Sequence, residues 1–214
     1  MTKRIFVTAT NTDIGKTYTT KLLLKEFSSR GIRVGVIKPI ETGVDEIAYD
    51  GVELLECVQA LNSEFMSLKV NDIVPITYKL AAAPYISSNK KNLDLNKLDL
   101  AIKKIENLCD ILIIEGAGGL YVPIDEKYKM IDLISYFKAT TLLVTHCSLG
   151  CINDTLLSEK ALKDLDINFI TAFNCNLNSN EFSKISEPYF LDTKKDVLKV
   201  DENIDTICDV LYNF

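Results

Sequence analysis

Residues near the start of the chain have the types and the order needed to hold a phosphate group. An apolar run, Ile5 to Ala9, is followed by Thr10-Asn-Thr-Asp-Ile-Gly-Lys-Thr17 and then by a helical pattern. In a strand, loop and helix of this kind, backbone N–H groups surround phosphate oxygens, the lysine neutralises them and the hydroxyl holds Mg²⁺. Thr10 stands where the pattern G-x-x-x-x-G-K-[ST] begins with glycine. The flanking strand and helix still favour a phosphate site over an ordinary strand-to-helix turn.

An acidic residue at the end of a second apolar run fits the same chemistry. Glu115 follows Ile111 to Ile114 and is itself followed by Gly116-Ala-Gly-Gly119. An acid at the end of a strand beside a phosphate loop can bind Mg²⁺ directly or through water. Taken alone, Glu115 could equally close a strand before a flexible turn. Together with the phosphate loop, it favours a metal and phosphate site.

The elements that must position these residues follow from the hydrophobic pattern. Short apolar runs alternate with helical patterns along most of the chain, which is typical of a parallel sheet with helices on both faces. We expect strands at 5–9, 34–38, 111–115, 141–145, 169–174 and, more weakly, 197–200. We expect helices at 16–30, 51–61, 94–108, 129–138, 153–165 and 202–213, and loops at 39–50 and 75–92. No repeat or linker interrupts the pattern, so we predict one domain over 1–214.

The carboxyl ends of the strands are where such a sheet binds its ligands. We therefore expect the chemistry at five strand ends: Thr10, Lys38, Glu115, His146 and Asn174.

Composition excludes several other classes of protein. Hydrophobic residues make up 47% of the 214 residues, which is enough for a sizeable core. The net charge of −6 weakens any case for nonspecific binding to nucleic acid or to an anionic membrane. No apolar run approaches the roughly 20 residues needed to cross a bilayer, and the N-terminus has no secretory apolar region. We expect a cytoplasmic protein with neither a membrane nor a nucleic acid partner.

The cysteines and the single histidine limit the chemistry further. The six cysteines form no C-x-x-C pair, and His146 alone cannot complete a zinc site with them. We expect free thiols that pack mostly in the core. Any Ser-His or Cys-His mechanism would need His146, which we expect to pack at the end of its apolar run.

Four segments, taken in order, resemble the dethiobiotin synthetase family. They are Thr8-Ala-Thr-Asn-Thr-Asp-Ile-Gly-Lys-Thr17, Lys38-Pro-Ile-Glu-Thr-Gly43, Glu115-Gly-Ala-Gly-Gly-Leu120 and Leu149-Gly-Cys-Ile-Asn153. The resemblance implies an α/β fold, a single-domain three-layer P-loop NTPase with a mostly parallel sheet. It also implies a Mg²⁺-dependent ligase that makes a cyclic urea from 7,8-diaminopelargonate, CO₂ and ATP. The intermediates would be a carbamate and a mixed carbamic–phosphoric anhydride, and the enzyme would be a homodimer.

The resemblance also implies a role for each matching residue. The triphosphate would contact Thr12, Asp13, Ile14, Gly15, Lys16 and Thr17. The metal positions are matched by Thr17, Glu115 and Asp50, with Glu53 as a competitor for Asp50. Gly116, Ala117 and Gly118 would lie beside phosphate and substrate, and Asn174 matches the position that contacts the purine. The catalytic lysines would be Lys38 and Lys16. Substrate contacts would come from Thr12, Lys38, Thr42 and Gly118 and, in the partner subunit, from the segment Gly150, Cys151, Ile152 and Asn153.

That last segment opens the predicted 153–165 helix, and without the resemblance we would interpret it as a simple helix cap. Free N–H groups there can bind a carboxylate, and Asn153 can cap the turn.

Ala9 replaces a glycine usual in the family. The C-terminal third lacks the Gly-x-Ile-Pro segment that frames the purine, which leaves the base preference open.

The reaction fits these residues on physical grounds. The substrate's own amines act as nucleophiles, so no histidine is needed. A carbamate and a terminal phosphate are both anions, and they repel unless cations lie between them. Each cation–anion contact at about 4 Å contributes roughly 4 kcal/mol at an effective dielectric constant near 20. Lys16, Lys38 and Mg²⁺ meet this need, and they would lower the pKa of a nearby substrate ammonium.

Other functions of a phosphate loop fit less well. Partitioning-type ATPases resemble one another in carrying a second lysine early in the phosphate loop. Positions 9–14 of this chain contain no lysine. A small-molecule kinase usually supplies arginines to the phosphoryl group, whereas the arginines here, Arg4, Arg30 and Arg33, precede the catalytic segments. A cobyrinate synthase would need a glutamine-hydrolysing domain, for which 214 residues leave no room.

Overall fold

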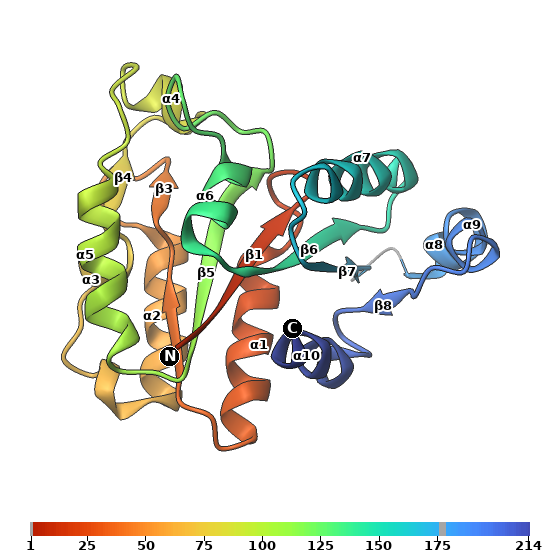
Figure 1. The fold of residues 1–214 in the computed structure, drawn as a ribbon, viewed down its shortest axis with the longest axis horizontal. Coiled ribbons are helices and arrows are strands. Elements are labelled where there is room, and N and C mark those ends of the chain that lie inside the picture. The colour runs from red at the N-terminus through yellow and green to blue at the C-terminus, as the bar shows by residue number, and fades with distance from the viewer. Residues whose placement is uncertain (1, 176–178) are drawn as a thin grey trace.

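A six-stranded sheet forms the centre of the computed structural model, which describes residues 2–175 and 179–214 (Figure 1). The strands lie in the order β2-β5-β1-β6-β7-β8, and every neighbouring pair is parallel. Their bounds are β1 (Lys3–Ala9), β2 (Val34–Ile37), β5 (Ile111–Gly119), β6 (Thr140–His146), β7 (Phe169–Asn174) and β8 (Leu198–Lys199). All carboxyl ends therefore meet at one edge of the sheet, where ligands bind in folds of this kind.

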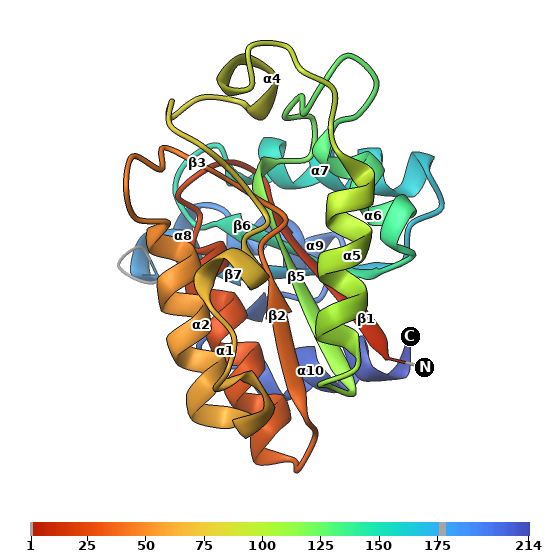
Figure 2. The same ribbon diagram turned by 90° about the vertical axis from the view of Figure 1, so that its left-hand side faces the viewer.

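Helices cover both faces of the sheet and complete three layers. Figure 2 shows α1 and α2 on one side of β2 and β5, and α5 and α6 on the other. The α10 helix packs beside α1, and α7 packs on β6. Their bounds are α1 (Lys16–Ser29), α2 (Tyr49–Leu61), α3 (Val70–Ile73), α5 (Leu95–Glu106), α6 (Met130–Phe137), α7 (Cys151–Asp164) and α10 (Ile204–Asn213), with a 3-10 helix η1 (Ser63–Phe65). The predicted three-layer α/β fold is confirmed.

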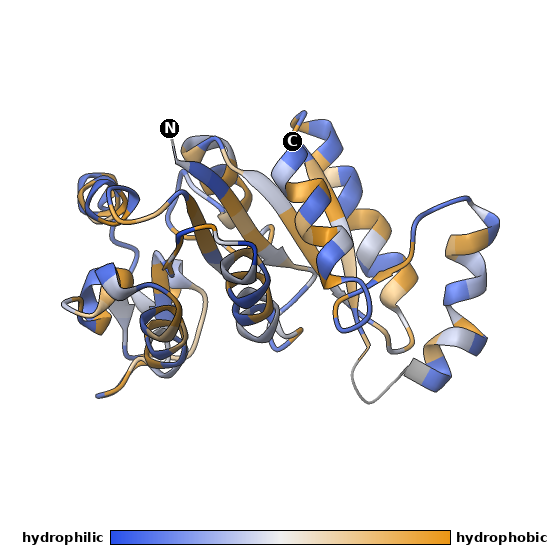
Figure 3. Ribbon diagram, turned by 90° about the horizontal axis from the view of Figure 1, so that it is seen from below, coloured by the Kyte–Doolittle hydropathy of each residue, from blue (hydrophilic) through white to orange (hydrophobic). Residues whose placement is uncertain are grey.

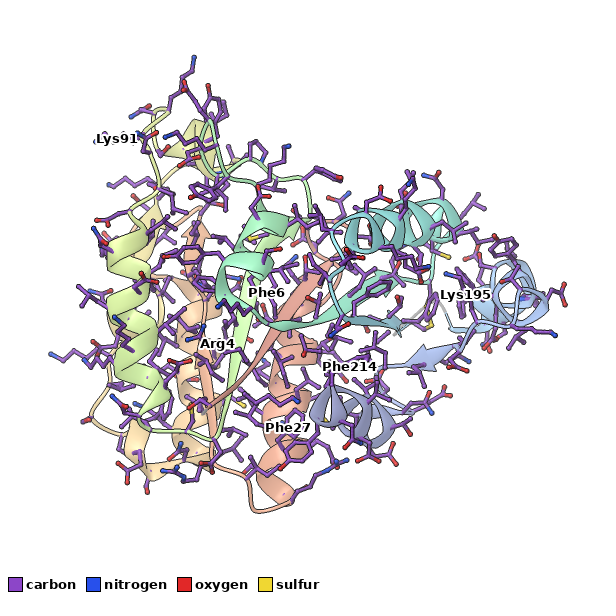
Figure 4. The ribbon with its side chains drawn as sticks, in the orientation of Figure 1. Arg4, Phe6, Phe27, Lys91, Lys195 and Phe214 are labelled. Carbon is purple, nitrogen blue, oxygen red and sulfur yellow. A yellow bond between two sulfur atoms is a disulfide. The ribbon has the colours of Figure 1, made fainter. Side chains whose placement is uncertain are left out.

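Continuous apolar runs explain why these strands lie in the middle layer. Ile111 to Ile114 of β5 are at most 1% exposed, as expected of parallel strands covered on both faces. Phe6 of β1 and Phe27 of α1 are fully buried (Figure 4). Each such side chain contributes about 1.5–3 kcal/mol by leaving water. Figure 3 shows the same division, with hydrophobic strands inside and helices whose outward faces are hydrophilic.

The two stretches predicted as loops contain regular structure, so that prediction was wrong. The 39–50 stretch contains β3 (Ile40–Thr42), and the 75–92 stretch contains β4 (Ile76–Tyr78) and α4 (Pro84–Ser87). The two strands pair in parallel as a separate two-stranded sheet. Strands of three residues are too short to show periodicity, and their partners lie far apart in the sequence. The α2 and α7 helices also begin two residues earlier than predicted.

The chain beyond β7 folds into a small arm, which we define as α8 (Ser179–Ile185) and α9 (Glu187–Asp192). Figure 1 shows the arm at the far end of the sheet from α5. Phe182 and Phe190 of the arm are fully buried against Phe173 of β7, with ring centroids 5.1 and 4.9 Å away. Lys195, which follows the arm, pairs with Glu159 of α7 (Figure 4). Sequence periodicity did not predict these short helices.

The expectation of six free thiols was wrong, because Cys147 and Cys175 form a disulfide. Each cysteine follows the last residue of a strand, and these strands, β6 and β7, are neighbours in the sheet. Their separation of 28 positions gave no sign of this bond in the sequence. Cys57, Cys109, Cys151 and Cys208 are free.

Within the described residues, no helix combines the length and the apolar character needed to cross a membrane.

Candidate active site

The loop after β1 forms a cradle of backbone N–H groups at the start of α1. Gly15 has a positive φ of 91°, and a Cβ there would overlap the amide nitrogen of Asn174, so the position requires glycine. No side chain caps the N-terminus of α1. Its first N–H groups are therefore free to bind an anion.

Lys16 is held inside this cradle. Its side-chain nitrogen donates a hydrogen bond to the backbone oxygen of Asn11 at 3.1 Å, and the residue is 8% exposed. Burial and, to a smaller extent, the positive charge of Lys38 lower the pKa of Lys16 to about 8, against smaller opposing effects of Glu115, Asp50 and Asp13. A bound anion would reverse this by stabilising the ammonium form.

Lys38, at the end of β2, lies in a buried charge cluster with Glu115 of β5. Its Nζ lies 2.6 Å from Oε1 of Glu115 and 2.8 Å from Oδ2 of Asp50, in the first turn of α2. Glu115 is fully buried. Burial lowers the pKa of Lys38, but the two carboxylates outweigh it and the net pKa shift is upward. Lys38 therefore carries a positive charge in the free protein.

The oxygens around Glu115 have the chemistry of a Mg²⁺ site. Its Oε1 accepts a hydrogen bond from the Thr17 hydroxyl at 2.8 Å, and its Oε2 is buried without a protein partner. No group of three His, Cys, Asp or Glu side chains in the described parts of the chain is arranged to hold a metal. Mg²⁺ is usually held by one or two carboxylates together with substrate phosphates, so Thr17, Glu115 and Asp50 fit that ion.

Asp50 and Glu53, the two competing acids, lie in different places. Asp50 faces Lys38, as described above. Glu53 pairs with Lys21 at 2.5 Å on the surface between α1 and α2, and its side chain is 55% exposed. Asp50 is thus the acid of α2 that the fold brings to Lys38 and Glu115.

Glu41 is a buried acid at the site to which the sequence assigned no role. It accepts hydrogen bonds from the backbone N–H groups of Asp50 and Gly51, at 3.2 and 3.0 Å, and so caps α2. Burial raises the pKa of Glu41, partly offset by Lys38. The cap fixes the first turn of α2 and with it Asp50. Glu41 lies in β3, a short strand that the sequence pattern did not reveal, so this cap was not predicted.

A cleft of about 700 Å³ joins these residues. One side is polar and carries Lys16, Thr17, Lys38 and Asp50. The other side is mostly apolar and is formed by Ala81, Ala82, Ala83, Pro84, Ala117 and Val122. Thr12, Asp13, Thr42 and Gly118 line the same cleft. The alanine-rich wall was not predicted, because it carries no chemically distinctive residue.

The glycines after Glu115 differ from one another in their surroundings. A Cβ on Gly116 would lie 2.8 Å from the ring of Phe6, so this glycine allows close packing inside the protein. Gly118 has a positive φ of 65° and lies beside Val122 at the cleft. Ala117 also lines the cleft, whereas Gly116 does not.

Asn174, at the end of β7, lies against the phosphate loop. Its amide nitrogen donates to the backbone oxygen of Ile14 at 2.8 Å, and its Oδ1 is buried without a protein partner. Among the described residues, the Oδ1 is thus a buried acceptor whose hydrogen-bonding capacity is not satisfied. His146 lies opposite Asn174 in the sheet. The prediction that His146 simply packs at the end of its apolar run was wrong. His146 contacts Ser148 Oγ at 2.6 Å and Asp154 Oδ2 at 3.0 Å.

The segment Gly150 to Asn153 forms the start of α7, next to Ser148 and Asp154. It does not line the 700 Å³ cleft of its own chain. Gly150 has a positive φ of 99° and begins α7 without any side-chain cap. The predicted cap by Asn153 is therefore wrong, because Asn153 is already in the first turn and its amide donates to Asp154 at 3.2 Å.

The parallel sheet and the Gly15-Lys16-Thr17 loop define this chain as a P-loop nucleoside triphosphatase. A model of the AAA domain family matches residues 3–209. Curated proteins called ATP-dependent dethiobiotin synthetase BioD match most of the chain, and the chain belongs to this dethiobiotin synthetase family. The Sulfurovum sp. protein is 42% identical, covering 87% of this chain and 89% of its own. The Wolinella succinogenes protein is 33% identical over 98% of both chains.

Solved structures show the same fold at low sequence identity. A plasmid partition protein from Borrelia burgdorferi has a TM-score of 0.60 at 10% identity, over 99% of this chain and 98% of its own. A ParA family ATPase from Chlorobium tepidum has a TM-score of 0.53 at 14% identity, over 99% and 92%. At such identities the likeness concerns the fold alone.

Proposed function

We propose that this protein is an ATP-dependent ligase of biotin synthesis that makes dethiobiotin from 7,8-diaminopelargonate, CO₂ and ATP. The family supports the reaction. The observation that carries it in this chain is the buried contact of Lys38 with Glu115, in the same cleft as Lys16. Two cations in one cleft would stabilise an anionic carbamate and a phosphate that are brought together there. Family and cleft do not favour a partitioning ATPase or a kinase.

The first step is carboxylation of a substrate amine. The neutral amine attacks CO₂, a C–N bond forms as one C=O π bond breaks, and the nitrogen gives its proton to solvent water, which leaves a carbamate. Lys38 stays charged at neutral pH because of its two carboxylates, and it is well suited to stabilise the new anion. The same charge lowers the pKa of a nearby substrate ammonium and leaves more neutral amine to react.

The second and third steps transfer phosphate and close the ring. A carbamate oxygen attacks the γ-phosphorus, ADP leaves, and a carbamic–phosphoric anhydride remains. The second amine then attacks the carbonyl carbon, and inorganic phosphate leaves. Lys16 and the N–H groups of the loop would hold the phosphates. Thr17, Glu115 and Asp50 would hold Mg²⁺, which supplies charge neutralisation at the phosphates when bound.

The rest of the cleft suits the substrate's shape. Its apolar wall, Ala81 to Pro84 with Val122, fits a methylene chain. Thr12, Thr42 and Gly118 would contact the reacting end. Asn174 Oδ1 would accept a hydrogen bond from the base of the nucleotide, since it has no protein partner.

The active enzyme is a cytoplasmic homodimer in this proposal. Gly150, Cys151, Ile152 and Asn153 of one subunit would bind the substrate's carboxylate tail in the cleft of the other. Two observations support this: the uncapped start of α7, and the absence of this segment from its own cleft. Leu149, Leu157 and Tyr121 lie nearby, are 79%, 60% and 62% exposed, and offer apolar surface to a second copy.

Mass spectrometry of the product tests the function directly. The purified protein is incubated with diaminopelargonate, bicarbonate, Mg²⁺ and ATP, and the ring-closed product is sought. We expect dethiobiotin and ADP in equal amounts, and neither without the diamine. ADP release that is independent of the diamine, with no product, would refute the proposal. Thermal shifts with each nucleotide then test the base preference.

A further inference from the structure

The Cys147–Cys175 disulfide lies where two strands deliver residues to the nucleotide side of the sheet. His146 and Asn174 are paired in the sheet, and each is followed at once by one of the two cysteines. The bond therefore ties the carboxyl end of β6 to that of β7. One of the tied residues neighbours Asn174, whose Oδ1 is the buried acceptor described above.

One side of the bond faces a second cleft, of about 420 Å³. Both cysteines line it, together with Asn174 and the phosphate-loop residues Asn11 to Ile14. Cys147 is 2% exposed and Cys175 is 6% exposed, and both line this cleft. We expect a small thiol or oxidant to approach the bond from this cleft, and a ligand seated on the loop to obstruct that approach.

The other side of the bond is apolar. Cys147 and Cys175 belong to a small cluster with Phe173, the arm residues Phe182 and Phe190, and Cys151. This cluster is separate from the main core. Burial raises the pKa of the Cys151 thiol. A protonated thiol is a poor nucleophile, so Cys151 does not readily exchange with the disulfide.

These contacts suggest a role for the disulfide in nucleotide binding. We propose that Cys147 and Cys175 form a reversible thiol-oxidation site that sets the affinity of the neighbouring phosphate loop for nucleotide. This inference rests on the proposed function, since it takes ATP as the ligand. In a cytoplasmic protein a disulfide of this kind is usually redox-sensing.

The chemistry of the site balances with a two-electron oxidant such as hydrogen peroxide. Each thiol loses one proton and one electron, and an S–S bond forms. The O–O bond of the peroxide breaks, and two water molecules are produced. A dithiol reductant reverses the change by way of a mixed disulfide. The reductant is itself oxidised to a cyclic disulfide and departs.

The effect on nucleotide follows from preorganisation. The bond restrains the end of β7, which carries Asn174. It also restrains the apolar cluster against which the arm packs. Without the bond, binding must order these groups, which weakens affinity. The two equilibria are linked. If the disulfide raises the affinity for nucleotide by a given factor, bound nucleotide must raise the equilibrium constant for disulfide formation by the same factor.

The first measurement is the affinity of the two redox forms of the unmodified protein. Calorimetry with Mg²⁺ and the non-hydrolysable imido analogue of ATP is done after peroxide or after dithiothreitol. We expect the reduced form to bind at least about fivefold more weakly. Cys57→Ser is the matched control, because Cys57 lies on α2 away from the cluster and should leave the redox difference unchanged.

The second measurement is the reciprocal one. The oxidised fraction is followed in glutathione buffers with and without the analogue, and we expect the equilibrium constant to shift by the same factor. A Cys147→Ser/Cys175→Ser variant should bind like the reduced form and ignore peroxide. Equal affinities of both redox forms would overturn the inference while leaving the proposed function intact. Failure of both forms to bind the analogue would overturn the proposed function together with it.

Discussion

The Nζ of Lys38 and the Oε1 of Glu115 lie 2.6 Å apart in the interior of the protein, although their residues are 77 positions apart. The neighbouring strands β2 and β5 bring them together. A buried ion pair costs desolvation and adds little net stability by itself. Its value in the proposed mechanism is that it keeps Lys38 charged in the same cleft as Lys16.

Lys38→Ala should abolish diamine-dependent ADP release while nucleotide binding stays largely intact. Removing one preorganised cation from a buried site lowers turnover by roughly 10²–10³-fold. Product formation and nucleotide titration measure the two effects separately. Lys21→Ala is the control, since Lys21 forms a surface pair with Glu53 and should change stability by less than about 1 kcal/mol. Near-normal turnover of Lys38→Ala would remove Lys38 from the mechanism.

Nucleotide binding should take up a proton at alkaline pH. The pKa of Lys16 is lowered to about 8 in the free protein, and phosphate oxygens would raise it again. The bound state therefore holds more protons above pH 8, and affinity falls as pH rises. Calorimetry at about pH 8.5 in buffers of different ionisation enthalpy measures the uptake. Lys16→Arg should abolish the uptake, because an arginine stays charged throughout.

The stability of the free protein should change in the same pH range. The ordinary pKa of a lysine is 10.5, and in the folded protein that of Lys16 is about 8. Between these values the unfolded chain holds more protons than the folded one, so this residue makes stability rise with pH over that window. Denaturant unfolding of the protein and of Lys16→Met tests the sign. An identical pH dependence in both would contradict it.

Asp50→Asn and Glu53→Gln make a matched pair of charge-neutralising changes on one helix. Asp50 faces Lys38 and Glu115, whereas Glu53 lies at the surface. We expect Asp50→Asn to raise the Mg²⁺ concentration needed for half-maximal activity by about tenfold or more, the order seen for groups that tune metal sites. Glu53→Gln should leave it unchanged. The opposite ranking would make Glu53 the third acid of the metal site.

Mixing two inactive variants tests whether each active site uses both subunits. Lys38→Ala disables a cleft, and Asn153→Asp places a negative charge beside the substrate's carboxylate. A mixed dimer would contain one intact site, built from the good cleft and the good α7 start. Random exchange should then restore roughly a quarter of normal activity. No recovery, with subunit exchange demonstrated, would mean that each site lies within one chain.

The sequence predicted those parts of the molecule in which local pattern and tertiary structure agree. Gly15, Lys16 and Thr17 stand in a recognisable order between a strand and a helix, and the buried run before Glu115 reads as a central strand. Glu41 and the Ala81 to Pro84 wall were not predicted, because pairing of two very short strands positions them. The Cys147–Cys175 bond depends on strand adjacency, which no spacing rule reports.

The β3–β4 pair has a consequence for how this fold could acquire new specificity. It belongs to a sheet of its own, with no ladder shared with the six strands among the described residues. Thr42 ends one of its strands, and the alanine wall follows the other. In the proposed function this pair therefore carries part of the organic-substrate site, whereas the phosphate loop follows β1 of the main sheet. The β4 strand and the wall that follows it, residues 76–84, could be exchanged for another diamine while Asp50 and the phosphate loop are kept unaltered.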